Sequence, residues 1–143
     1  MKKLIIFFVT ILAFVGTISY IYAQNKISKN EVTLQNEEYV KLLNNEISGT
    51  KLATLMNKTF DKNTANKVEV AKDGSFVDND TNSILIEIKF LQSDSIFKFE
   101  KIYKNKIEEF IRLYSNEKFK CTKLEYHSKT KFVKYLYFEQ VEW

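Results

Sequence analysis

The sequence predicts an α+β fold in which an N-terminal transmembrane helix continues into a helical stalk, followed by a folded domain. Three observations lead to this prediction: an uncharged apolar run near the N-terminus, a polar segment without glycine or proline after it, and later stretches in which apolar residues alternate. Such alternation is typical of half-buried strands, and strand-like and helix-like stretches mostly occur in separate runs. We therefore expect a mainly antiparallel sheet of about five strands with two packed helices.

Residues 4–23 form the apolar run, which is 20 residues long and holds no charge and no proline. At about 1.5 Å per residue, a helix of this length matches the roughly 30 Å hydrocarbon core of a bilayer. A cleavable signal sequence has a shorter apolar stretch, of about 7–15 residues, and small residues before the cut. Here the large Ile21 occupies one of those positions. We predict an uncleaved anchor; a cleaved signal and a buried core helix are the alternatives.

The lysines at the N-terminus predict the orientation of the anchor. Lys2 and Lys3 precede the apolar run, and a short basic N-terminus normally stays in the cytoplasm. The sequence thus predicts a single-pass protein of the cell membrane, with a cytoplasmic tip and anchor (1–23), a stalk (24–46) and an extracytoplasmic domain (47–143). The lipid bilayer is the expected partner of residues 4–23, and another envelope protein is a candidate partner of the domain.

The charge beyond the anchor argues against a nucleic-acid partner. The whole chain has a net charge of +4, but residues 24–143 hold 20 basic and 18 acidic side chains, with the lysines scattered among the acids. Interspersed charges of both signs are typical of a solvated surface rather than of a basic groove. We expect no nucleic acid to bind.

The stalk, residues 24–46, is polar with a loose apolar stripe through Val32, Tyr39 and Leu43, on which Asn36 also falls. It contains neither glycine nor proline, so nothing in the sequence ends the helix at the membrane surface. We predict a helix that then packs on the domain. A long helix docked on a sheet, as in type IV pilins, and a disordered linker are the alternatives.

The first half of the domain is predicted to hold one helix and three strand segments. A break is expected at residues 47–49, after which Thr50 has the character of an N-cap. Residues 68–79 are predicted to form a hairpin, because Asp73-Gly74 is typical of a tight turn between strands. Residues 84–91 alternate as in a half-buried strand. The helix has four apolar residues at helical spacing, Leu52, Leu55, Met56 and Phe60.

The second half is predicted to hold a strand, a helix and a final hairpin. The strand comprises residues 96–100, with Phe97 and Phe99 inward. The helix has apolar residues at positions 107, 110, 111 and 114, a spacing of i, i+3, i+4 and i+7. Strands at residues 119–126 and 132–141 then enclose a turn. Because the last strand is apolar on both faces, we expect it in the centre of the sheet or beneath a helix.

Candidate chemistry in this sequence is sparse. Residues 78–82 (Asp-Asn-Asp-Thr-Asn) resemble the start of a calcium loop, but Ser83 stands where that loop has glycine and Lys89 where it has glutamate, so a polar turn is the better interpretation. His127 is the only histidine, which excludes a zinc site built from several histidines. The glycines are too far apart for a phosphate loop. We therefore assign no catalytic, metal-binding or cofactor-binding residue and expect no cofactor.

Cys121 and Met56 also have side chains that could react or bind a ligand. Cys121 is the only cysteine, so no internal disulfide is possible. It lies six residues before His127 on one predicted strand, about 20 Å away at 3.3 Å per residue, too far for a nucleophile and its base. We expect a buried, slow-reacting thiol on the same side as Phe119. A bulge near residues 122–123 would put the four apolar residues of that strand on one face; without it, both faces must be partly covered. Met56 is expected in the core.

Residues 47–58 (ISGTKLATLMNK) and residues 119–127 (FKCTKLEYH) carry a family resemblance. With the anchor included, the chain resembles small uncharacterised single-pass membrane proteins of clostridia and related Firmicutes. The resemblance implies no activity, and it makes Cys121 and His127 part of the group's pattern. The composition favours a bacterial source, because 21 lysines against 1 arginine, 12 asparagines and no proline reflect the bias of an AT-rich genome.

Three classes of function are compatible with these observations. We expect an anchored extracytoplasmic binding or protein-interaction domain, which needs only a tether, a fold and an exposed surface. A pilin-like or secretion-apparatus subunit is the alternative, although the glutamate that prepilins carry inside the apolar run is absent here. An enzyme of unknown type is third, because the usual bases, nucleophiles and metal ligands are scarce.

Overall fold

The computed structural model describes the backbone of residues 2–142, and it leaves the side chains of residues 2–4, 27 and 104–106 undescribed. The chain divides into two compact units, Met1–Gln35 and Asn36–Trp143. Helix α1 (Lys2–Val40) makes up the first unit and ends in the second. It is long and apolar enough to cross a membrane, and within it the hydroxyls of Thr10 and Thr17 donate to backbone carbonyls one turn earlier. Such internal bonds satisfy polar groups where no water is present.

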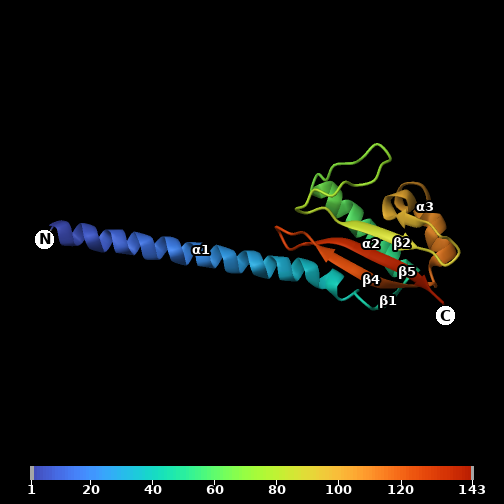
Figure 1. Cartoon of the computed structure of the whole chain (residues 1–143), viewed down its shortest axis with the longest axis horizontal. Coiled ribbons are helices and arrows are strands. Elements are labelled where there is room, and N and C mark those ends of the chain that lie inside the picture. Colours follow the sequence, from blue (N-terminus) through green and yellow to red (C-terminus); the bar gives the residue numbers. More distant parts are fainter. Residues whose placement is uncertain (1, 143) are drawn as a thin grey trace. The chain divides into compact units, whose positions relative to one another are not determined.

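The second unit is a five-stranded sheet with two helices, as the α+β prediction requires (Figure 1). The sheet has the order β1-β4-β5-β2-β3; β2 and β5 are parallel, and every other neighbouring pair is antiparallel. The last strand is therefore central, as predicted. The strands are β1 (Glu46–Ser48), β2 (Leu85–Lys89), β3 (Ile96–Lys98), β4 (Lys118–Tyr126) and β5 (Val133–Val141), and the helices are α2 (Gly49–Ala65) and α3 (Phe99–Tyr114).

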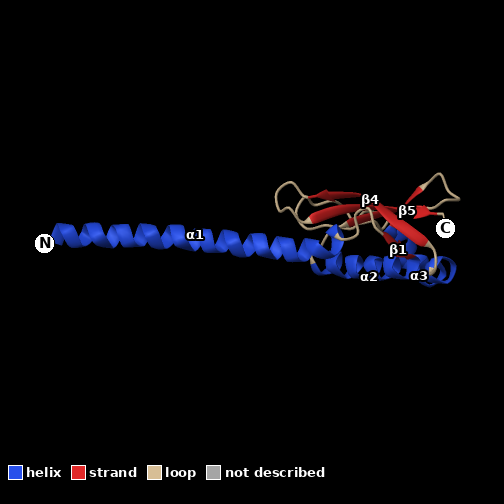
Figure 2. Ribbon diagram, turned by 90° about the horizontal axis from the view of Figure 1, so that it is seen from below, coloured by secondary structure: helices blue, strands red, loops and turns tan. Residues whose placement is uncertain are grey.

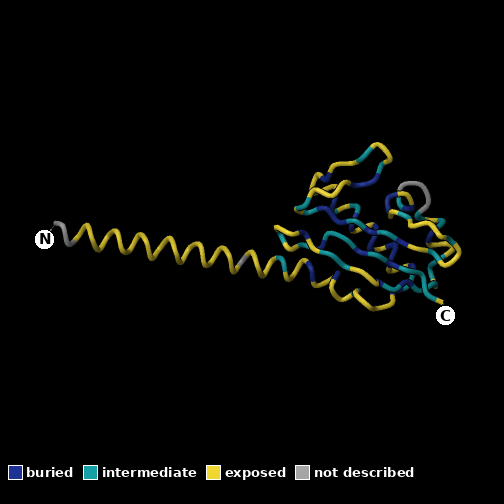
Figure 3. The backbone as a smooth tube through the Cα atoms, in the orientation of Figure 1, coloured by how far each residue is buried: buried dark blue, intermediate teal, exposed yellow. Residues whose placement is uncertain are grey.

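The core lies between one face of this sheet and the two helices, which Figure 2 shows on the same side of the strands. Along β2, the side chains of Ile86 and Ile88 are buried, while Leu85 and Glu87 are only half-buried. Leu136 and Phe138 continue the buried row on β5, the neighbouring strand. Figure 3 shows buried residues along the strands and helices of this unit. The sheet is thus buried on one face, which is what alternation along a strand predicts.

Helix α2 begins differently from the prediction. Residues 46–48 form β1, with Ile47 opposite Phe119 of β4, where a break was expected. The hydroxyl of Ser48 accepts the N–H of Lys51 at 3.3 Å, so Ser48 rather than Thr50 is the N-cap. The physical reason is that strand pairing holds the chain extended up to Ser48, so the helix starts with the next residue.

The hairpin predicted at residues 68–79 is only partly formed. Gly74 adopts the left-handed conformation expected of the turn, at φ 83°, and Val70 and Phe76 form one isolated antiparallel bridge. Beside this bridge, the Ala71 N–H donates to the Ser75 carbonyl at 2.8 Å and the Val77 N–H donates to the Glu69 carbonyl at 2.9 Å. The carboxylate of Asp73 accepts the N–H of Ser75 at 3.0 Å, and that of Glu100 accepts the N–H of Phe76 at 2.9 Å. The pairing extends no further, so the segment is a loop and not two full strands.

The strand predicted at residues 96–100 is shorter than expected, because α3 starts at Phe99. The fully buried Phe99 is the first residue of a helical apolar stripe that continues through Ile102 to Phe110. Glu100 therefore lies in the first turn of a helix rather than in a strand.

The stalk stripe is confirmed at Asn36 and Tyr39, which are 9% and 3% exposed. It is wrong at Leu43, which is exposed because α1 ends at Val40 and the chain leaves the helix before it. The Asn36 side-chain amide donates to the carbonyl of Lys131 at 2.7 Å and accepts the N–H of Val133 at 2.9 Å. One side chain thus joins the last turns of α1 to the connection between β4 and β5.

Burial raises the pKa of the Glu100 carboxyl above its ordinary value. Because the folded state favours the protonated form, this group's contribution to stability is complete below the ordinary pKa and is lost as the pH rises through the raised value. We expect Glu100→Gln, whose amide oxygen can still accept the Phe76 N–H, to raise the Tm near neutral pH and to change it little below about pH 4. Thermal melts of both proteins across this range test the expectation; a lower Tm for the variant at neutral pH would contradict it.

Candidate functional site

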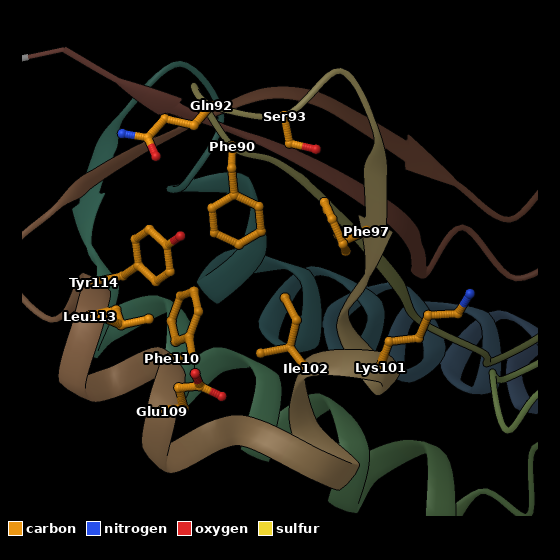
Figure 4. A pocket seen from close by; sticks show the side chains of 10 residues that line it. All are labelled: Phe90, Gln92, Ser93, Phe97, Lys101, Ile102, Glu109, Phe110, Leu113 and Tyr114. Atoms are coloured by element: carbon orange, nitrogen blue, oxygen red, sulfur yellow. The ribbon is translucent and has the colours of Figure 1, made fainter.

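A cleft of about 550 Å³ opens between α3 and the end of β2 with its turn into β3 (Figure 4). Phe90 directly follows β2, and Phe97 is the middle residue of β3. Helix α3 supplies the opposite wall through residues on one of its faces. The lining residues are Phe90, Gln92, Ser93, Phe97, Lys101, Ile102, Glu109, Phe110, Leu113 and Tyr114.

The apolar wall is organised around the ring of Phe90. Its centroid lies 5.5 Å from that of Phe97, 4.8 Å from that of Tyr114 and 6.3 Å from that of Phe110. Figure 4 shows these rings converging from the strands and from α3 on the same hollow. Edge-on and tilted ring contacts of this kind are favourable and hold each ring in place. The wall is therefore built from rings that support one another.

Polar groups are confined to a few positions around this wall. Gln92 and Ser93 come from the β2–β3 turn, and Lys101 and Glu109 come from α3. Leu113, also in the lining, leaves 51% of its surface exposed. An apolar hollow of a few hundred Å³ with a small number of polar groups is the usual form of a ligand site. The cleft is thus suited to bind an apolar group.

Cys121 is buried in β4 and is not part of the cleft lining. Its thiol donates to the carbonyl of Lys123 at 3.5 Å, across a register shift between these two residues. The shift lies where a bulge was considered, at residues 122–123. Burial raises the pKa of the Cys121 thiol to about 11. At neutral pH the thiol is therefore almost entirely protonated and a poor nucleophile.

We expect Cys121 to react slowly with thiol reagents in the folded protein and quickly after denaturation. Labelling of the full chain in lipid nanodiscs, with and without denaturant, measures both rates. Cys121→Ser should lower the Tm slightly, because a hydroxyl replaces an apolar thiol in the core. Fast labelling of the folded chain near neutral pH would mean an activated thiolate and would favour an enzyme or a redox sensor.

His127 and the loop at residues 78–83 come together, although 44 residues separate His127 from Ser83. The imidazole is fully buried, and its Nε2 lies 2.7 Å from the carbonyl oxygen of Ser83. A carbonyl only accepts, so Nε2 carries the hydrogen. Nδ1 lies 3.7 Å from Oδ1 of Asp78, too far for a hydrogen bond. His127 thus connects the β4–β5 turn to this loop.

Asp78 is held by its own loop. Burial acts to raise the pKa of Asp78, but hydrogen bonds from the Asp80 N–H and the Ser83 hydroxyl, with Lys134 nearby, lower it overall. The side-chain oxygen of Asn79 accepts the N–H of Thr81 at 3.0 Å, and it also accepts the N–H groups of the next two residues. These bonds describe a polar turn in which one oxygen of Asp78 and the side-chain oxygen of Asn79 accept hydrogen bonds from the turn itself. No group of three or more His, Cys, Asp or Glu side chains in the described part of the chain is placed to hold a metal ion.

Met56 is fully buried in the core, as predicted. The cleft itself was missed by the sequence reasoning, although its aromatic residues were expected on the inner faces of their elements. The available signal was their number: Phe90, Phe97, Phe110 and Tyr114 fall within 25 residues of one another. Periodicity predicts the face of a helix or strand on which such a ring lies. It does not predict whether the rings of two elements pack closely or leave a cleft between them.

Comparison of the chain with protein-family models, with curated proteins and with solved structures finds no match. The resemblance to small clostridial membrane proteins therefore stays a prediction.

Proposed function

We propose that the protein is a membrane-anchored extracytoplasmic binding or protein-interaction domain, and that the cleft beside α3 is its binding site. The cleft carries this proposal, because four aromatic side chains line an open hollow at the surface instead of closing it. Aromatic rings offer a large apolar area with few rotatable bonds, so they bind an apolar group at little cost in conformational entropy.

The anchor supports the membrane part of the proposal. Residues 4–23 hold the protein in the cell membrane, with the N-terminus in the cytoplasm and the domain outside. We expect the mature chain to begin at Met1 and to stay with membranes after a carbonate wash. Mass spectrometry of the N-terminus and fractionation measure this, and a soluble chain beginning at Gln24 would show that the run is a cleaved signal. Protease added outside right-side-out vesicles should digest the domain; protection until detergent is added would reverse the orientation.

Binding in the cleft can be followed with a reporter at its rim. A trifluoromethyl label on Gln92→Cys, in a Cys121→Ser background, supplies one ¹⁹F signal in the full chain in lipid nanodiscs. We expect 4-ethylphenol, a small ring with one polar end, to shift this signal saturably. Leu113→Glu should abolish the shift, because it places a charge in the apolar lining.

The matched control is Val70→Glu, since Val70 is about as exposed as Leu113 and lies outside the lining. This variant should bind 4-ethylphenol as the parent does. Equal responses from both glutamate variants, or no saturable shift in the parent, would show that the cleft is not a binding site.

A further inference from the structure

We infer that the cleft receives an extended polypeptide segment, which adds to the free edge of β3 and places an apolar side chain in the hollow. This inference rests on the proposed function of the cleft as a binding site.

The first step concerns the backbone of β3. This strand is last in the sheet order and pairs only with β2, through Ile88 opposite Phe97 and the pairs on either side. In an edge strand, alternate N–H and C=O groups point away from the sheet. Apart from the ladder with β2 and the bonds within α3, no backbone hydrogen bond among the described residues reaches residues 96–98. The outer edge of β3 therefore keeps donors and acceptors for a further strand.

The second step is that this edge and the hollow belong to the same short segment. Phe97 lines the cleft, and its neighbour Ile96 is 53% exposed. Figure 4 shows β3 beside the hollow, with the rings of Phe97 and Phe90 facing α3. A small organic molecule would use only the hollow. An extended peptide uses both features, because its backbone pairs with the edge while alternate side chains point toward the helix.

The third step concerns the charge at the end where β3 passes into α3. Lys98 and Lys101 lie there, and both are exposed. The exposed carboxylate of Asp73 attracts both, and the buried carboxyl of Glu100, which accepts the N–H of Phe76, also attracts Lys98. Because Lys101 also lines the cleft, an acidic group on a bound segment can pair with it.

The length of β3 limits the partner further. A strand of three residues that ends in lysine is unfavourable for edge-to-edge pairing of two whole sheets. It can still pair with a short extended segment. The partner is thus a short extended segment with an apolar residue and, near it, an acidic one.

The test uses an array of acetylated hexapeptides, each with one Phe, one Asp and randomised remaining positions, added to the ¹⁹F-labelled full chain in nanodiscs. We expect a subset to shift the signal saturably. N-methylation of one alternate set of amides in the best binder should weaken it roughly tenfold or more, because backbone bonds are lost while the side chains stay. N-methylation of the other set should have little effect. Asp→Asn in the peptide should weaken binding to the parent but not to a Lys98→Ala/Lys101→Ala variant.

The outcomes separate this inference from the proposed function. If 4-ethylphenol binds and no hexapeptide does, the cleft is a binding site for small molecules and the inference is wrong. If peptides bind equally well after N-methylation of either set, side chains alone hold them and strand addition is wrong. If neither probe binds, both proposals fail.

Discussion

Replacement of Gly49 by alanine is expected to destabilise the domain by about 3 kcal/mol or more. Gly49 begins α2 directly against the C-terminal end of α3. A Cβ at this position would lie 1.8 Å from the carbonyl oxygen of Tyr114 and 2.6 Å from its carbonyl carbon. These are backbone atoms, so one of the two helices must move. Movement would also strain the hydrogen bond from the Gly49 N–H to the carbonyl of Glu117, which is 2.8 Å long.

Urea unfolding of the full chain in nanodiscs, followed by near-UV circular dichroism, measures this loss. The matched control is Gly16→Ala in α1, where an added Cβ would meet no atom within 4 Å. The control should unfold at the same urea concentration as the parent. Identical midpoints for the Gly49 and Gly16 variants would show that α2 and α3 do not meet as closely as described.

Ile86→Ala is expected to cost about 2–5 kcal/mol of unfolding free energy. Ile86 is 1% exposed and lies in β2 opposite Leu136 of the central strand. Truncation removes buried methyl groups and leaves a cavity that the two neighbouring layers cannot close, so both the transfer term and the cavity term apply.

The control for this variant is the preceding residue. Leu85→Ala removes the same number of carbon atoms from the opposite face of β2, where the side chain is only half-buried. We expect a clearly smaller shift in the urea midpoint. A loss for Leu85→Ala as large as that for Ile86→Ala would mean that both faces of the sheet are covered.

Most elements of this fold could be predicted from periodicity. The strand of Ile86 and Ile88, the helix of Phe110 and the final hairpin each have a repeat of 2 or 3.6 residues, and each is present in the structure. The helix begins earlier than the pattern at residues 107–114 indicated, at Phe99. The central position of β5 also followed, because a strand with apolar residues on both faces is more stable away from a sheet edge.

The hairpin predicted at residues 68–79 is only partly formed, for a reason that periodicity does not contain. The Asp73-Gly74 turn formed and the residues beside it share two backbone hydrogen bonds, but the pairing stops at the Val70–Phe76 bridge. The Phe76 N–H donates to Glu100, 24 residues later, so this segment also bonds to the start of α3. The place of Glu100 in a helix rather than a strand was itself not predicted.

The properties that depend on local pattern and on counts could be predicted from the sequence alone. These are an apolar run long enough to span a membrane, a domain with nearly balanced charge, a single cysteine without a partner, and the direction in which each strand and helix turns its apolar face. The apolar run and the direction of each apolar face depend on residues close together in the chain, whereas the charge balance and the single cysteine are counts, so none of them requires the fold.

The contacts between distant segments follow from the complete fold and could not be predicted from local pattern. The parallel pairing of β2 with β5, the contact of buried His127 with Ser83 and the cleft between Phe90 and α3 join residues that are about 20 to 50 positions apart. The free energy of these contacts depends on the packing of the whole domain. A backbone group can form its hydrogen bonds with many partners, and an aromatic ring can be buried against many others. Local pattern predicts that such a backbone group or ring is buried or hydrogen-bonded, and the complete fold determines which residue contacts it.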